Sequence, residues 1–79
     1  MTERIDAEIA EILSLTLGRS VTAAEDLKRA DEPKWDSLKH LEIIFAVEGA
    51  YGVSFSPDEI AAVGGAADLK TKVLAADAA

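Results

Sequence analysis

The chain has 79 residues, of which 15 are acidic and 8 basic, giving a formal net charge of −7 with its single histidine neutral. This length predicts one domain over residues 1–79, with too little chain for a deep cleft between domains. The negative charge repels phosphate backbones and anionic lipids, so we expect neither nucleic acid nor membrane as a partner. The chain has no cysteine and one histidine, which excludes thiolate and His-paired zinc motifs, and we expect no metal site.

The hydrophobic content, 49% of residues, is typical of a folded globular protein. The longest apolar run without glycine, Ile43–Val47, is far shorter than the ~20 residues that cross a bilayer. The segment Met1–Asp6 has neither the basic flank nor the apolar stretch of a secretory signal. We therefore expect a monomeric, cytoplasmic protein whose chemistry comes from a partner or a prosthetic group.

The first segment predicts an amphipathic helix from Thr2 to Leu17, because Ile5, Ile9 and Ile12 recur at helical spacing. Gly18 is a natural stop for this helix.

Residues 19–35 have no sustained period and predict a long loop. Within it, Thr22–Glu25 matches a capping box, which favours a short helical turn leading to Leu27 as the loop's core anchor. Residues 26–32 do not reproduce the calcium-loop pattern of oxygen ligands around a central glycine. Because long loops in compact domains are usually functional or disordered, the end of this one is a candidate site.

A second helix is predicted from Ser37 to about Tyr51, with Asp36 as its N-cap and Gly52 as its stop. At about 100° per residue it has two apolar stripes. One stripe consists of Ile43, Ile44, Val47 and Tyr51. The other consists of Leu38, Leu41 and Phe45, mixed with Glu42 and Glu48. A small helical domain buries one stripe, so the second is a candidate binding face, unless the long loop folds back over it.

The third helix is short and begins at the sequence Ser56-Pro57-Asp58-Glu59, which provides an N-cap, a proline at the first position and a capping-box glutamate. Gly64-Gly65 ends it, and a last helix follows from about Ala66 to Ala76. We therefore expect an all-α fold, a four-helix bundle of three longer helices and one short helix, with a long loop between the first two.

Ser37 is the most informative position, because it starts a helix whose N–H groups and dipole favour a phosphate. On spacing alone, the simpler interpretation is that Asp36 and Ser37 only cap the helix. A catalytic pair of Ser37 and His40 is rejected, because the sequence offers no third group to orient His40 and no oxyanion donors. His40 is interpreted as a partly buried helix residue, and we expect no catalytic residues.

Several segments together resemble an acyl carrier protein of the discrete, stand-alone form. They are Asp36-Ser37-Leu38, Leu41 to Glu48, Tyr51-Gly52-Val53 and Asp58-Glu59-Ile60. The resemblance covers nearly the whole chain and includes the order of helices and the long loop. Asp-Ser-Leu alone would be a weak motif, but its place at a helix start after such a loop makes it specific.

The resemblance implies that Ser37 carries 4′-phosphopantetheine, transferred from coenzyme A by a phosphopantetheinyl transferase. The thiol of this group would hold acyl intermediates as thioesters in fatty-acid, polyketide or other specialised acyl biosynthesis, and so in lipid metabolism. Asp36 would help the transferase position Ser37 and its metal. Acyl-transferring, ligating or condensing enzymes would dock their basic surfaces on the second helix. The residues of this recognition face would be Asp36, Leu38, Leu41, Glu42, Phe45 and Glu48.

Four positions depart from the usual pattern of fatty-acid carriers. Trp35 replaces a small or aliphatic residue, Lys39 replaces a commonly acidic one, and Gly49-Ala50 replaces what is often a run of glutamates. These departures favour a specialised carrier with a different set of partners. Two alternatives remain open: an aminoacyl or peptidyl carrier of a nonribosomal pathway, and an unmodified acidic helical adaptor.

Overall fold

The structure is a computed structural model that describes residues 2–23 and 25–78. These residues form four α-helices and one short 3-10 helix. In chain order they are α1 (Thr2–Leu17), η1 (Arg29–Asp31), α2 (Ser37–Tyr51), α3 (Pro57–Ala62) and α4 (Ala66–Ala78). The described part of the chain contains no strand, so the all-α prediction of three longer helices and one short one is confirmed.

The helix bounds follow the local signals closely. The predicted bounds of α1 and α2 are confirmed, and both helices end at a glycine in the left-handed region, Gly18 at φ 69° and Gly52 at φ 65°. Ser56 and Glu59 form the complete capping box predicted at the start of α3. The last helix continues two residues beyond the predicted end at Ala76, because its alanine-rich end contains no residue that would stop it.

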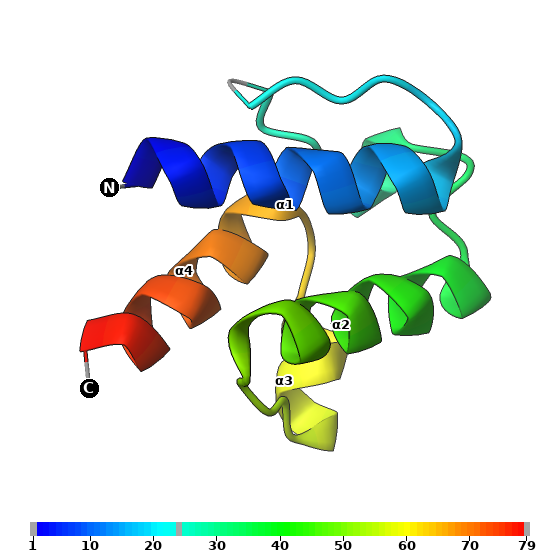
Figure 1. Cartoon of the computed structure of the whole chain (residues 1–79). Helices are drawn as coiled ribbons and strands as arrows, with labels where there is room; N and C mark the ends of the chain where they lie inside the picture. Colours follow the sequence, from blue (N-terminus) through cyan, green and yellow to red (C-terminus); the bar gives the residue numbers. More distant parts are fainter. Residues whose placement is uncertain (1, 24, 79) are drawn as a thin grey trace.

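The core lies where α1 packs against α2 and against α4 (Figure 1). In the same view both chain ends lie on one side of the molecule. Large side chains from all three long helices are completely or almost completely buried there. They are Ile9, Leu13, Ile43, Ile44, Val47 and Leu69. Of the three isoleucines predicted for the core face of α1, only Ile9 is fully buried, and Ile5 and Ile12 pack at its edge.

The loop between α1 and α2 is held by a hydrogen bond to α1, by an ion pair within the loop and by a buried leucine. The Ser14 hydroxyl accepts a hydrogen bond from the Val21 N–H at 2.9 Å. The Arg19 guanidinium lies 3.1 Å from the carboxylate of Glu25. Leu27 is buried, which confirms its prediction as the anchor of the loop.

The capping box predicted at Thr22–Glu25 includes residue 24, which lies outside the described residues. The Glu25 N–H bonds the Thr22 carbonyl at 3.1 Å, as in a turn. The Glu25 carboxylate, which a capping box would direct to the Thr22 N–H, binds Arg19 instead.

The loop is also joined to the segment between α3 and α4 by backbone hydrogen bonds. The Arg29 N–H donates to the Gly64 carbonyl and the Ala66 N–H donates to the Leu27 carbonyl, both at 2.8 Å. Gly65 lies between them, and a Cβ atom there would be 2.5 Å from the Leu27 carbonyl oxygen. This close approach requires glycine.

In the described residues no helix is long and apolar enough to cross a membrane.

Candidate functional site

Ser37 is exposed and is the first residue of α2. Asp36 caps the helix as predicted, because its carboxylate accepts a hydrogen bond from the Lys39 N–H at 2.9 Å. The His40 N–H bonds the Asp36 carbonyl at 2.9 Å. The N–H groups of Ser37 and Leu38 have no partner within the helix, and together with the helix dipole they favour an anion at the Ser37 hydroxyl.

Trp35 and His40 support this helix start from within the protein. The Trp35 side chain is 3% exposed, and its indole N–H donates to His40 Nδ1 at 2.9 Å. The other ring nitrogen of His40, Nε2, lies 2.7 Å from the Ile60 carbonyl oxygen in α3. An indole N–H can only donate, so Nδ1 accepts and Nε2 carries the imidazole proton.

His40 is 5% exposed and lies in α2, so it is a helix residue as predicted but is more deeply buried than the partial burial predicted for it. Both ring nitrogens bond inside the protein and neither is directed to Ser37. His40 is therefore not placed as a base for the Ser37 hydroxyl. Trp35 and His40 lie only five residues apart, but a tryptophan before a helix and a histidine within it do not by themselves predict a hydrogen bond.

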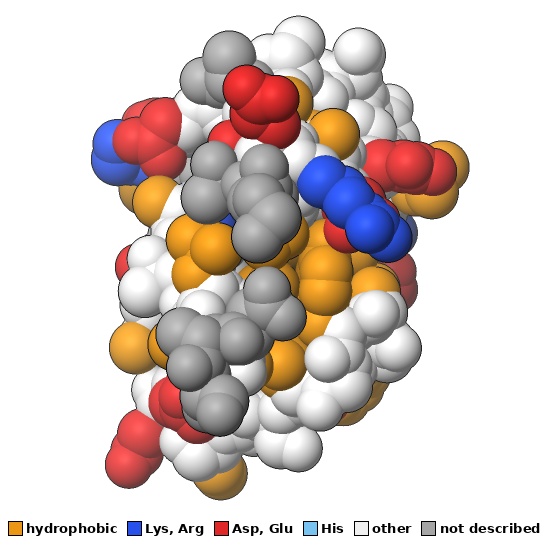
Figure 2. Space-filling view, turned by 60° about the vertical axis from the view of Figure 1, so that its left-hand side comes forward, with side chains coloured by type: hydrophobic (Ala, Val, Ile, Leu, Met, Phe, Trp, Pro, Cys, Tyr) orange, Lys and Arg blue, Asp and Glu red, His pale blue; other side chains and the backbone are white. Residues whose placement is uncertain are grey.

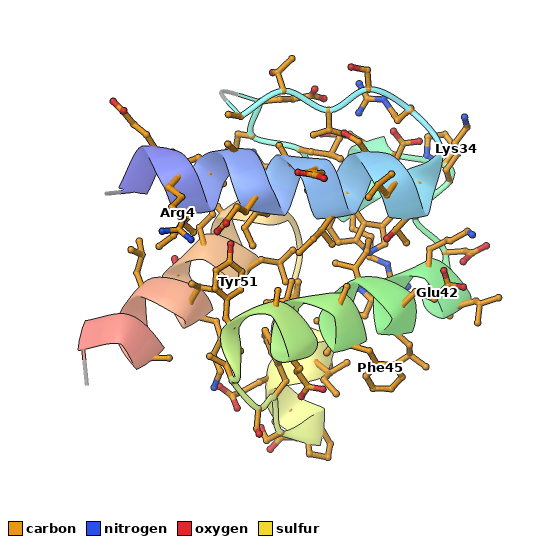
Figure 3. All side chains as sticks on the ribbon, in the orientation of Figure 1. Arg4, Lys34, Glu42, Phe45 and Tyr51 are labelled. Carbon is orange, nitrogen blue, oxygen red and sulfur yellow. The ribbon has the colours of Figure 1, made fainter. Side chains whose placement is uncertain are left out.

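The second apolar stripe of α2 is open to solvent. We call Leu38, Leu41 and Phe45 the α2 stripe; their exposed fractions are 64%, 41% and 60%. Figure 3 shows Phe45, near the middle of α2, directed away from α1, whereas Tyr51, the last residue of α2, is directed toward it. The alternative in which the long loop covers this stripe is wrong, since the loop buries Val21, Leu27 and Trp35 in the core instead.

The three acidic residues predicted for the recognition face each have a partner within the chain. Asp36 caps α2. The Glu42 carboxylate lies 3.7 Å from the Lys39 ammonium group on the helix surface. The Glu48 carboxylate accepts the Phe55 N–H at 2.8 Å. Lys39 and Glu42 are three residues apart, a spacing at which side chains on one helix meet. The contact of Glu48 with Phe55 depends instead on the turn after α2.

A polar cluster lies at the far end of α2, where the Tyr51 hydroxyl donates to the Glu8 carboxylate at 2.7 Å. Burial, and then this hydrogen bond, raise the pKa of Tyr51 to about 12. The same bond lowers the pKa of Glu8, which also receives a hydrogen bond from Arg4.

Figure 2 shows the side of the molecule where α1 begins and α4 ends, and there hydrophobic side chains gather between acidic and basic ones. A hollow there is lined by Arg4, Ile5, Glu8, Ala50, Tyr51, Val73 and Leu74.

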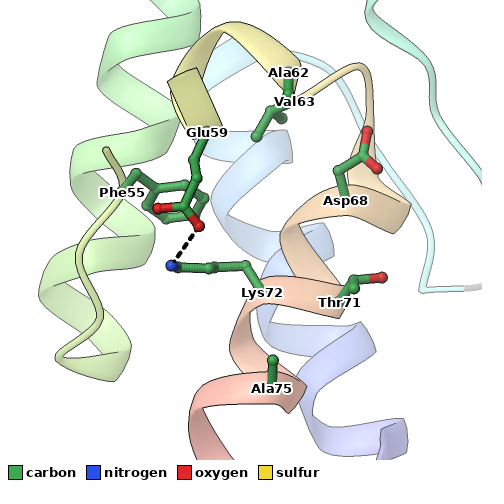
Figure 4. Close-up of a pocket in the computed structure, with 8 residues that line it drawn as sticks. All are labelled: Phe55, Glu59, Ala62, Val63, Asp68, Thr71, Lys72 and Ala75. Atoms are coloured by element: carbon green, nitrogen blue, oxygen red, sulfur yellow. Dashed lines mark hydrogen bonds and ion pairs between the residues drawn. The ribbon is translucent and has the colours of Figure 1, made fainter. Parts of the chain in front are cut away.

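A smaller hollow lies between α3 and α4 (Figure 4). The Lys72 ammonium group bonds the Glu59 carboxylate at 2.7 Å and lies 5.4 Å from the centre of the Phe55 ring. The bond from Lys72, followed by hydrogen bonding from the Ser56 backbone, lowers the pKa of Glu59 to about 2. The charges of Glu59 and Lys72 are therefore paired with each other, and the other carboxylate of this hollow, Asp68, accepts the Gly64 N–H at 2.7 Å.

Within the described ranges, no group of three or more acidic or histidine side chains could hold a metal ion. Neither of the hollows described above is lined by Ser37. The chemistry available at the site is therefore that of one exposed hydroxyl at a helix start beside an apolar surface.

Three comparisons with known proteins give no match. No protein-family model, no curated protein and no solved structure matches the chain. The function therefore has to be argued from the geometry of the site itself.

Proposed function

We propose that this protein is an acyl carrier protein, a four-helix bundle modified on Ser37 with 4′-phosphopantetheine. The observation that carries the proposal is an exposed serine as the first residue of α2, next to an exposed apolar stripe. A phosphodiester on Ser37 would lie beside the free N–H groups of the first turn, where the helix dipole stabilises negative charge.

The fit of the group to the site rests on access and on charge. The Ser37 hydroxyl is exposed to an approaching enzyme, and Lys39 follows two residues later in the same turn. The group supplies what the chain lacks, a thiol that can hold an acyl chain as a thioester. The protein then presents tethered cargo at a raised local concentration to each enzyme it meets and does no catalysis itself.

The α2 stripe is the surface that we propose for docking of the phosphopantetheinyl transferase and of acyl-transferring, ligating or condensing enzymes. Leu38 and Leu41 follow Ser37 by one and four residues, which is about one turn of the helix. An enzyme that covers these two leucines therefore has its reactive groups near the serine. Because Asp36, Glu42 and Glu48 already have intramolecular partners, we infer that apolar contact contributes more to this docking than charge.

The same experiments distinguish this proposal from two other functions. An aminoacyl or peptidyl carrier would use the same serine and arm, and differs in the enzyme that loads it. An unmodified adaptor would use the α2 stripe without any change at Ser37.

The proposal is tested by incubating the purified protein with coenzyme A and a broad-specificity phosphopantetheinyl transferase, followed by intact mass measurement. We expect one phosphopantetheine adduct on the wild type and on Ser54→Ala, which removes another exposed serine. We expect none on Ser37→Ala. An adduct that persists in Ser37→Ala, or no adduct on the wild type, would refute the carrier function. Loading assays with malonyl transferases and with adenylating enzymes then identify the class of cargo.

A further inference from the structure

We propose that Trp35 and His40 are positioning residues for the modification of Ser37. Their hydrogen bonds form a chain from the Trp35 indole through the His40 imidazole to the Ile60 carbonyl of α3. The inference rests on the proposed function and adds to it the two side chains that hold the serine in place.

The two residues of this hydrogen-bonded chain flank the serine in the sequence. Trp35 precedes Ser37 by two residues and His40 follows it by three, so the bond between their rings closes a loop around the helix start. The ring centroids lie 6.1 Å apart. The backbone on this side is also held, because the Trp35 carbonyl accepts a hydrogen bond from Arg29 Nε at 3.4 Å.

The first turn of a helix frays readily unless its entering segment is fixed, since its N–H groups lack intrahelical partners. Here the buried indole fixes the entering segment and the imidazole ties the first turn to α3. Asp36, which caps α2, and Ser37, which presents the hydroxyl, lie between these two anchors. A preformed helix start spares the transferase the cost of ordering it.

The imidazole tautomer is the first readout. If the two hydrogen bonds of His40 exist in solution, the ¹⁵N chemical shifts of its imidazole report an unprotonated Nδ1 and a protonated Nε2. A proton on Nδ1 in the neutral ring would contradict the Trp35 bond and overturn the inference.

Three variants separate positioning from simple stability. Trp35→Phe keeps an aromatic ring in the core but has no N–H. His40→Gln places its amide nitrogen near the position of Nε2 and keeps the link to Ile60, but gives up the acceptor for Trp35. His40→Asn places its amide oxygen near the position of Nδ1 and keeps the acceptor, but gives up the link to Ile60.

The rate of phosphopantetheine transfer to each variant is measured under conditions where circular dichroism shows all of them folded. We expect kcat/KM of the transferase to fall about fivefold for Trp35→Phe, His40→Gln and His40→Asn, because each breaks one of the two hydrogen bonds, and Ser54→Ala to stay within about twofold of the wild type. Wild-type rates for all three variants would overturn the positioning role and leave the carrier function intact. Rates that follow melting temperature alone across the three variants would also overturn it. Failure of the wild type to be modified would instead refute the carrier function.

Discussion

Substituting alanine at Gly65 tests the packing of the long loop, with Gly64→Ala as a neighbouring control. At Gly65 an added Cβ atom would lie 2.5 Å from the Leu27 carbonyl oxygen and 3.1 Å from Lys28 Cα. Both contacts involve backbone, which cannot turn aside as a flexible side chain can. At Gly64 the nearest atom is the Asp68 carboxylate oxygen at 3.5 Å, an ordinary contact.

The magnitude follows from what must move. Relieving the overlap at Gly65 costs about 1–3 kcal/mol, as for other overpacked sites. Separating the segments also weakens the two backbone hydrogen bonds on either side of Gly65, each with a net contribution of about 1 kcal/mol. The reduced freedom of the unfolded chain returns about 0.4–1 kcal/mol. Gly65→Ala is therefore expected to lower the free energy of unfolding by about 2–4 kcal/mol, and Gly64→Ala to leave it unchanged or slightly raised.

The assay is urea unfolding followed by the fluorescence of the single tryptophan, Trp35, and by circular dichroism. Trp35 lies in the same loop, so partial release of the loop from α3 and α4 would also shift its emission toward longer wavelength. If Gly65→Ala unfolds at the same urea concentration as Gly64→Ala, the close backbone approach of the loop is not a feature of the protein.

Three further predictions concern single side chains. Phe45→Ala is expected to change the free energy of unfolding by less than about 0.5 kcal/mol while slowing loading by partner enzymes, because the ring is exposed; a large loss of stability in urea unfolding would show that the stripe is core. Absorbance of the single tyrosine, Tyr51, is expected to titrate near pH 12, so its contribution to stability is present below pH 10.0 and lost as the pH rises toward about 12; a midpoint near 10.0 contradicts the bond to Glu8. Glu59 stabilises the fold above its ordinary pKa of 4.5, and this contribution is lost as the pH falls toward about 2. Acid unfolding of Lys72→Met, which lacks the main cause of the shift but keeps the bonds to Ser56, should show a weaker dependence on pH; an unchanged dependence contradicts the role of Lys72.

The parts of the fold that could be predicted from the sequence are those with a signal inside one segment. Asp36 and Gly52 mark the ends of α2, and the residues of the capping box mark the start of α3. The two stripes of α2 follow from its period alone, and the structure buries one and exposes the other as the pattern indicates.

The parts that could not be predicted join segments far apart in the chain. The attachment of the loop beside Gly65 is made by backbone groups, which every sequence has. The Tyr51 bond to Glu8 spans 43 residues, and the His40 bond to Ile60 spans 20. Such pairs depend on how the helices are seated, which no local pattern encodes.

The acidic residues illustrate a different limit. The resemblance places Glu48 on a face for partner enzymes, whereas in the structure its carboxylate accepts the Phe55 N–H. Net charge describes the chain as a whole, and the availability of one carboxylate depends on the backbone donors near it.

The most direct test of the carrier function is to locate the modification by tandem mass spectrometry after treatment with coenzyme A and the transferase. Trypsin cleaves after Lys34 and Lys39, and the peptide released, residues 35–39, contains Ser37 as its only hydroxyl side chain. We predict one phosphopantetheine group per chain, found on this peptide alone. An unmodified 35–39 peptide, or a modification on any other serine, would contradict the account.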